Sequence, residues 1–151
     1  MTEMVELKEI TRHNYEDVLR LHVAEHQQTF VSSTAHSLAQ AYVYRDTAFP
    51  FAIYADDTLV GFIMFGYYEA REQYTLWKFL IDERYQNQGY GREALRLGIA
   101  YVKERFDARE IYTGVVPQNS IAKHLYDSVG FRATGIVEDN MEEMRLICEP
   151  H

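Results

Sequence analysis

Two glycines that follow a strand-like segment form the part of this sequence best suited to binding a ligand. The apolar run from Leu76 to Ile81 gives way to polar residues, and Gly89 and Gly91 then open a long helical pattern. Glycine lets the backbone come close to a ligand, and the first turn of a helix offers unpaired N–H groups at the positive end of its dipole. This arrangement favours a phosphate or pyrophosphate ligand.

Two common phosphate-binding motifs fit this segment poorly. Residues 89–94 match the dinucleotide pattern G-x-G-x-x-[GA], and Glu110 lies near the expected position of a ribose-binding acid. That pattern occupies a tight turn directly after its strand, whereas a polar connection separates Asp82 from Gly89, and Glu110 starts its strand rather than ending it. The Arg92-Glu93 pair stands where a Walker A loop requires Lys-Ser/Thr, which excludes that loop.

A second group of residues with chemical potential surrounds Tyr126. Asn119 stands at a predicted helix start, and Ile121, Leu125 and Val129 are spaced as one apolar row of that helix. Tyr126 then lies about 100° round the helix from Leu125, so its hydroxyl is expected to point into a groove rather than the core. The alternative is a half-buried tyrosine whose hydroxyl makes a structural hydrogen bond.

The segment from His22 to His26 matches H-x-x-E-H, a pattern of zinc peptidases, with Glu25 beside the second histidine. A catalytic zinc site also needs a third protein ligand, and the neighbouring sequence offers no distinctive one. We therefore favour a solvated helix face without a metal.

Hydrophobic periodicity predicts the elements that carry these residues. The predicted strands are 5–10, 51–55, 59–68, 74–82, 110–116, 131–137 and 141–147, and the predicted helices run from Thr11 or Asn14 toward Phe30, from 34 to 45, from the glycines to 106, and from 120 to 129. This mixed order, with antiparallel neighbours and crossover helices, predicts an α+β fold in a single domain spanning residues 1–151.

Composition narrows the class of protein. Hydrophobic residues make up 47% and charged residues 25% of the chain, as in soluble globular proteins. The net charge of −8 argues against a nucleic-acid partner; it suits a cationic substrate, or serves solubility alone. A single cysteine, Cys148, an N-terminus without the layout of a secretory signal and no apolar run of about 20 residues favour a cytoplasmic protein outside the membrane.

Taken together, these features resemble the GNAT acyltransferases. The acetyl-CoA motif of that family, [RQ]-x-x-G-x-[GA], is matched by residues 86–91 between a strand and a long helix, and Asn119, Tyr126 and Gly130-Phe131 match in the later part. The resemblance is good over residues 58–147. It implies a mixed, mostly antiparallel central sheet flanked by helices. Within the family, the segments 30–33, 37–42 and 48–52 are most similar to the bacterial spermine/spermidine (diamine) N-acetyltransferases.

The resemblance also implies roles for individual residues toward acetyl-CoA. Tyr126 is the expected general acid that protonates the departing thiolate. The expected cofactor-binding residues are Phe79, Leu80 and Ile81 along the pantetheine, Gln86, Asn87, Gln88, Gly89, Tyr90, Gly91 and Arg92 at the pyrophosphate, Asn119 at the pantetheine, and Lys123 at the phosphates.

The implied reaction acetylates a primary amine of a small polyamine. Related enzymes can carry a glutamate base at the head of the cofactor strand, but Trp77 and Lys78 occupy that region here. Glu69 and Glu72 are therefore expected at the substrate as candidate bases, with an ordered water as the alternative. For the substrate's ammonium groups we expect His22, Glu25 and His26.

Other acceptors and roles stay open. The acceptor can instead be a protein N-terminus, a lysine or an aminoglycoside, and a non-catalytic acyl-CoA-binding module is the alternative outside enzymes. The terminal strands and surface aromatic residues are expected to support a homodimer.

Overall fold

The computed structural model describes residues 3–23 and 33–148. Within these ranges the elements follow one another as β1 (Val5–Lys8), α1 (Tyr15–Leu19), α2 (Thr34–Val43), β2 (Ala48–Ala55), β3 (Thr58–Tyr68), β4 (Gln73–Ile81), the 3₁₀ turn η2 (Glu83–Tyr85), α3 (Tyr90–Phe106), β5 (Glu110–Val115), α4 (Ser120–Ser128), β6 (Arg132–Glu138) and β7 (Met141–Ile147). In this part of the chain, no helix combines the length and hydrophobicity that a membrane span requires.

The strands form one mixed sheet in the order β1-β2-β3-β4-β5-β7-β6. Strands β4 and β5 run parallel, and every other neighbouring pair is antiparallel. A parallel pair needs a crossover connection, and α3 provides it between β4 and β5. The α+β prediction with a mostly antiparallel sheet is thus confirmed.

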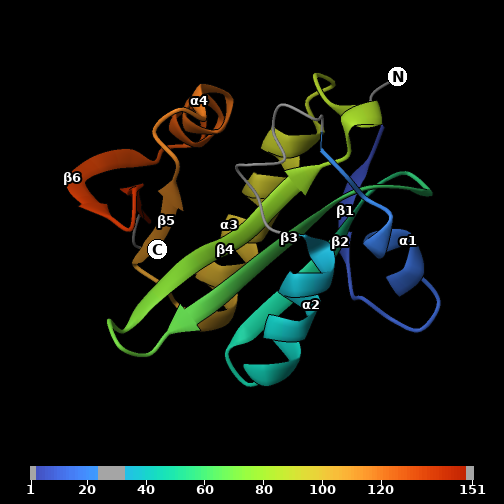
Figure 1. Cartoon of the computed structure of the whole chain (residues 1–151), viewed down its shortest axis with the longest axis horizontal. Coiled ribbons are helices and arrows are strands. Elements are labelled where there is room, and N and C mark those ends of the chain that lie inside the picture. The colour runs from blue at the N-terminus through green and yellow to red at the C-terminus, as the bar shows by residue number, and fades with distance from the viewer. Residues whose placement is uncertain (1–2, 24–32, 149–151) are drawn as a thin grey trace.

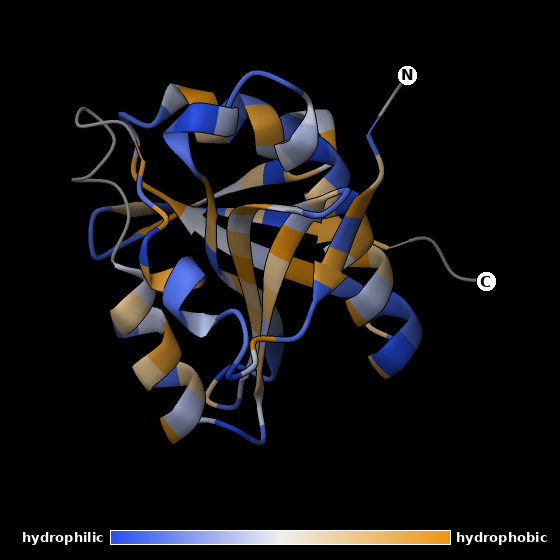
Figure 2. Cartoon of the chain, turned by 90° about the vertical axis from the view of Figure 1, so that its right-hand side faces the viewer, coloured by the Kyte–Doolittle hydropathy of each residue, from blue (hydrophilic) through white to orange (hydrophobic). Residues whose placement is uncertain are grey.

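Helices cover both faces of the sheet, with α3 behind the central strands and α1 and α2 in front of them in Figure 1. Two hydrophobic clusters result, one including Ile63 and Leu95 and the other including Phe62 and Val18. Because β3 is buried on both faces, its sequence is a continuous apolar run rather than an alternating one. Figure 2 shows these hydrophobic strands between the helices.

The first predicted helix is much shorter than its sequence pattern suggested. Helix α1 ends at Leu19, and the N–H of Leu21 bonds to the carbonyl of Val18, which closes the last turn tightly. Leu21 and Val23 are still buried, but they lie outside any helix or strand. Burial alone therefore produced an apolar spacing that resembled a helix.

Strand β4 contains one extra residue beside β3. Met64 pairs with Lys78 and Phe65 pairs with Leu76, so Trp77 has no partner and forms a β-bulge. Trp77 packs on the cluster that contains Met64, beneath α1 and α2. The bulge therefore turns two consecutive side chains, those of Trp77 and Lys78, toward the same face of the sheet.

We expect Gly66→Ala to destabilise this bulge. A Cβ at Gly66 would lie 2.3 Å from ring atoms of Trp77, closer than packed carbon atoms approach. Overpacking of this kind costs about 1–3 kcal/mol, measurable as a lower urea midpoint. Gly114→Ala is the matched control, since its Cβ meets nothing closer than 3.4 Å. Equal midpoints for the two variants would contradict the expectation.

Candidate active site

The parallel strands β4 and β5 separate after a short paired stretch. They pair only at Tyr74–Ile111, Thr75–Tyr112 and Leu76–Thr113, although β4 continues to Ile81. The Thr113 hydroxyl donates to the carbonyl of Leu76 at 3.3 Å, at the last paired position. Beyond it, residues 78–81 pair with β3 alone among the described strands, which leaves one backbone edge of β4 facing the gap.

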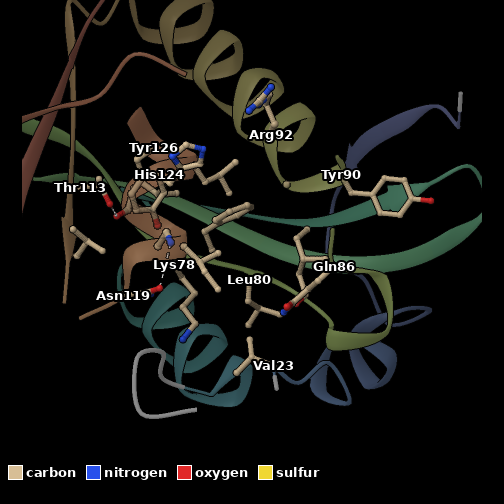
Figure 3. A pocket seen from close by; sticks show the side chains of 18 of the residues that line it. Val23, Lys78, Leu80, Gln86, Tyr90, Arg92, Thr113, Asn119, His124 and Tyr126 are labelled. Atoms are coloured by element: carbon tan, nitrogen blue, oxygen red, sulfur yellow. Dashed lines mark hydrogen bonds between the residues drawn. The ribbon is translucent and has the colours of Figure 1, made fainter. Parts of the chain in front are cut away.

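This gap is part of a cavity of about 880 Å³. It is lined by β4, by the loop and first turn of α3, by β5 and by the start of α4, as Figure 3 shows. Of the residues expected to bind the cofactor, those on the wall are Phe79, Leu80, Ile81, Gln86, Asn87, Gly89, Tyr90, Gly91, Arg92 and Asn119. Tyr126 lines the same space, so the structure brings the two sequence motifs together.

The glycine loop is built for close contact with a ligand. Gly89 has a φ of +86°, a conformation that strains other residues, and a Cβ there would meet no atom within 4 Å. At Gly91 a Cβ would lie 3.3 Å from both Phe79 and Leu125. The first helical bond runs from the N–H of Glu93 to the carbonyl of Gly89, so the preceding N–H groups have no acceptor within the helix. The loop thus fits an anionic group.

Asp82 joins this loop to the end of β4. Its fully buried carboxylate accepts bonds from the backbone N–H (3.0 Å) and Nε (2.8 Å) of Arg84 and from the N–H of His22 (3.2 Å). Burial raises the pKa of this carboxyl, but the bonds from Arg84 and His22 outweigh it and leave the pKa below its usual value. Asp82 therefore stays ionised and holds the segment after α1 against the loop.

Tyr126 is almost completely buried, with 7% of its surface exposed, and packs on Phe131. Its hydroxyl shares a hydrogen bond with Thr113, and burial raises its pKa to about 12. The phenol is therefore protonated throughout the physiological pH range and keeps a proton to donate. Tyr126 lines the cavity but also belongs to the buried core cluster, so its ring faces both. Ile121 of the same helix is 62% exposed and belongs to no core stripe, contrary to prediction.

Asn119 is the N-cap of α4. Its Oδ1 accepts the N–H of Ala122 at 3.2 Å, which satisfies one of the unpaired donors of the first turn. The side chain also lines the cavity, so its Nδ2 donor is positioned beside that space.

Several expected site residues lie elsewhere. Glu69 and Glu72 belong to the exposed β3–β4 turn, at the end of β4 remote from the glycine loop, because β4 runs from that turn to the loop. Lys123 does not line the cavity; its ammonium pairs with Glu142 at 2.8 Å. Gln88 is exposed and outside the lining. Spacing along the chain could not reveal these directions.

The expected substrate residues on the first helix are only partly described. Glu25 and His26 lie outside the described residues. The ring of His22 is exposed, and its Nδ1 lies 3.8 Å from Oδ2 of Asp82 while its Nε2 lies 3.9 Å from Oε1 of Glu83. His22 does not line the cavity, although the next residue, Val23, does. The described part of the chain contains no cluster of side chains that could hold a metal ion.

Sequence reasoning missed several residues of the cavity wall, among them the polar side chains of Lys78, Thr113 and His124. Lys78 is only 6% exposed, and burial lowers its pKa to about 8. The one signal in the sequence was a lysine within an apolar strand. No aspartate or glutamate occurs among the described residues that line the cavity.

Comparisons with known proteins agree with this architecture. The model of the acetyltransferase (GNAT) family matches residues 10–131. A spermine/spermidine N(1)-acetyltransferase of Bacillus subtilis (strain 168) is 32% identical over 94% of this chain and 97% of its own length. A crystal structure of spermidine N-acetyltransferase from Vibrio cholerae in complex with CoA and spermine superposes with a TM-score of 0.78 at 16% identity, over 95% of each chain. A dodecameric structure of spermidine N-acetyltransferase from Vibrio cholerae superposes with a TM-score of 0.72 at 15% identity, over 95% of this chain and 93% of that chain.

Proposed function

Because this chain belongs to the acetyltransferase (GNAT) family, we propose that it transfers an acetyl group from acetyl-CoA to a primary amine of a small polyamine. The observation that carries the proposal is one cavity whose wall contains both the glycine loop and Tyr126. The name of the Bacillus relative and the net charge of −8 favour a polycationic acceptor.

The cavity suits acetyl-CoA in shape and in chemistry. The N–H groups of residues 89–92 provide donors for the pyrophosphate, with Arg92 as a cation beside them. The backbone edge of β4 at residues 79–81 offers donors and acceptors to the amides of the pantetheine, and Asn119 adds an amide donor. Acetyl-CoA supplies the acetyl group as a thioester.

Tyr126 is the proposed acid of the reaction. A thiol of pKa about 8.5 is a fair leaving group, so its departure needs only a positioned hydrogen-bond donor. Complete proton transfer from a phenol with a pKa of about 12 to such a thiolate is uphill by more than three pKa units. Tyr126 therefore acts chiefly by donating a hydrogen bond to the charge that develops on sulfur.

The acceptor class is tested by measuring CoA release over a panel of amines. Spermine, spermidine and simple diamines should turn over, whereas an aminoglycoside and peptides with a free N-terminus or a lysine should be poor acceptors. Turnover of a peptide or aminoglycoside alone would replace the polyamine proposal with one of the alternative acceptors. Tight CoA binding without transfer to any amine would identify a non-catalytic acyl-CoA-binding module.

Variants of Asn119 separate its two proposed tasks. Asn119→Ser keeps an N-cap but loses the amide donor, so stability should be retained while the KM for acetyl-CoA rises about fivefold. Asn119→Ala should raise KM similarly and also lower stability by about 1 kcal/mol. An unchanged KM in both variants, measured by steady-state kinetics, would assign Asn119 to capping alone.

We also propose a homodimer in the cytoplasm. Exposed apolar residues on the terminal hairpin, among them Ile136, Val137 and Ile147, offer a surface for a second copy. The single free cysteine, Cys148, suits a reducing compartment. Sedimentation of the wild type and of Val137→Lys tests the dimer, which the lysine should dissociate.

A further inference from the structure

A buried lysine stands on the cavity wall at the bulge of β4. The bulge turns Lys78 toward the same face as Trp77, and the neighbouring strand residues Leu76 and Leu80 are buried too. Lys78 lines the same cavity as Tyr126, and Figure 3 shows its side chain between Tyr126 and Val23. A cation here is unexpected, because the proposed acceptor is itself cationic.

The acceptor must lose a proton within this cavity. A primary amine with a pKa of about 10.4 arrives as ammonium at pH 7 and cannot attack a carbonyl in that form. The described wall offers no carboxylate, and Glu69 and Glu72 lie at the far turn. The guanidinium of an arginine does not serve as a base in proteins. Among the described lining residues this leaves Lys78 and His124 as side chains that carry a basic nitrogen.

We propose that Lys78 is the general base that accepts the proton of the substrate ammonium. The N–H bond of the ammonium breaks, the proton binds Nζ of Lys78, and the substrate nitrogen keeps the electron pair that forms the new N–C bond. Lys78 then returns the proton to solvent. This inference rests on the proposed amine acetylation.

Burial makes such a role possible at neutral pH. With a pKa of about 8, roughly one Lys78 in ten is neutral at pH 7, compared with about one in three thousand at the ordinary value. Among the described residues, titratable side chains on the surrounding elements include Tyr44 beside Trp77, His22 after α1, and Asp82 after β4. Others line the cavity itself: Tyr85, Tyr90, Arg92, His124 and Tyr126. An ammonium group bound next to Lys78 disfavours a second charge there, so the pair readily sheds one proton.

Two measurements test the base. The first titrates the ¹³Cε resonance of Lys78 by NMR in the free protein, with the peak assigned by its absence in Lys78→Met. A midpoint near pH 8 is expected, and one near 10.4 would overturn the inference whatever the enzyme acetylates. The second is the pH profile of kcat/KM for spermidine. Activity should fall below the pKa of the base, because only the neutral amine accepts a proton.

Lys78→Met and Lys78→Arg should both lose at least tenfold in kcat/KM for spermidine at pH 7.5, since neither side chain can accept a proton. The loss should shrink severalfold with methoxyamine, a primary amine that is already neutral at this pH. Lys8→Met, an exposed strand position, is the matched control and should keep wild-type rates.

An equal loss with both acceptors would indicate a structural role for Lys78 and overturn the inference. The inference would also be overturned if the fall of kcat/KM at low pH persists in Lys78→Met but disappears in His124→Gln. If the wild type acetylates no amine, the proposed function itself fails, and the NMR titration still reports the state of Lys78 separately.

Discussion

Tyr126→Phe is expected to lower kcat for polyamine acetylation by about 10²–10³. The variant keeps the ring that packs on Phe131 but removes the buried hydroxyl, so the sulfur loses its hydrogen-bond donor. Binding of acetyl-CoA should hardly change, because the loop at residues 86–92 remains intact. Rapid-mix kinetics and a calorimetric titration with CoA measure the two quantities separately.

The pH dependence provides a second readout for Tyr126. Burial raises its pKa to about 12, so the wild-type phenol should not lose its proton below about pH 11, and no alkaline limb in that range should belong to it. Tyr42→Phe, an exposed tyrosine on α2, is the control and should retain wild-type kcat. A Tyr126→Phe enzyme with unchanged kcat would remove this residue from the mechanism.

Asp82→Asn is expected to lower the free energy of unfolding by about 2–4 kcal/mol at pH 7. The buried carboxylate accepts hydrogen bonds from four N–H groups of His22 and Arg84, and an asparagine amide would direct its own donors at some of them. Because Arg84 is exposed, we attribute most of the effect to the backbone N–H bonds of His22 and Arg84 rather than to the ion pair. Urea unfolding measures this difference.

Asp82→Asn should also make the free energy of unfolding depend less on pH in the acid range. The folded pKa of Asp82 lies below its unfolded value of about 3.9, so its stabilisation is present above pH 4 and is lost as the pH falls through the folded pKa. Asp127→Asn is the control, since Asp127 pairs with Arg132 on the surface and should cost less than about 0.5 kcal/mol. Similar losses for the two variants would contradict the role of Asp82.

Features that depend on local backbone chemistry could be read from the sequence. The glycine loop, the helix start at Asn119 and the succession of strands and helices along the chain were predictable, because each depends on a few neighbouring residues. The glycine motif at residues 86–91 and the later motif with Asn119 and Tyr126 were together enough to identify the family, and the comparisons confirm that family.

Strand pairing decided the remaining features of the site. The cavity exists because β4 and β5 part after Leu76, and the bulge at Trp77 turns Lys78 inward. Neither event has a local signature, since each depends on which residues of distant strands pair. For the same reason Glu69, Glu72 and Lys123, plausible by spacing, point away from the cavity. The sequence by itself determined which groups are present and where the loop lies. Tertiary packing decided which of them face one another and which charge is buried, because desolvation depends on neighbours that lie far apart along the chain.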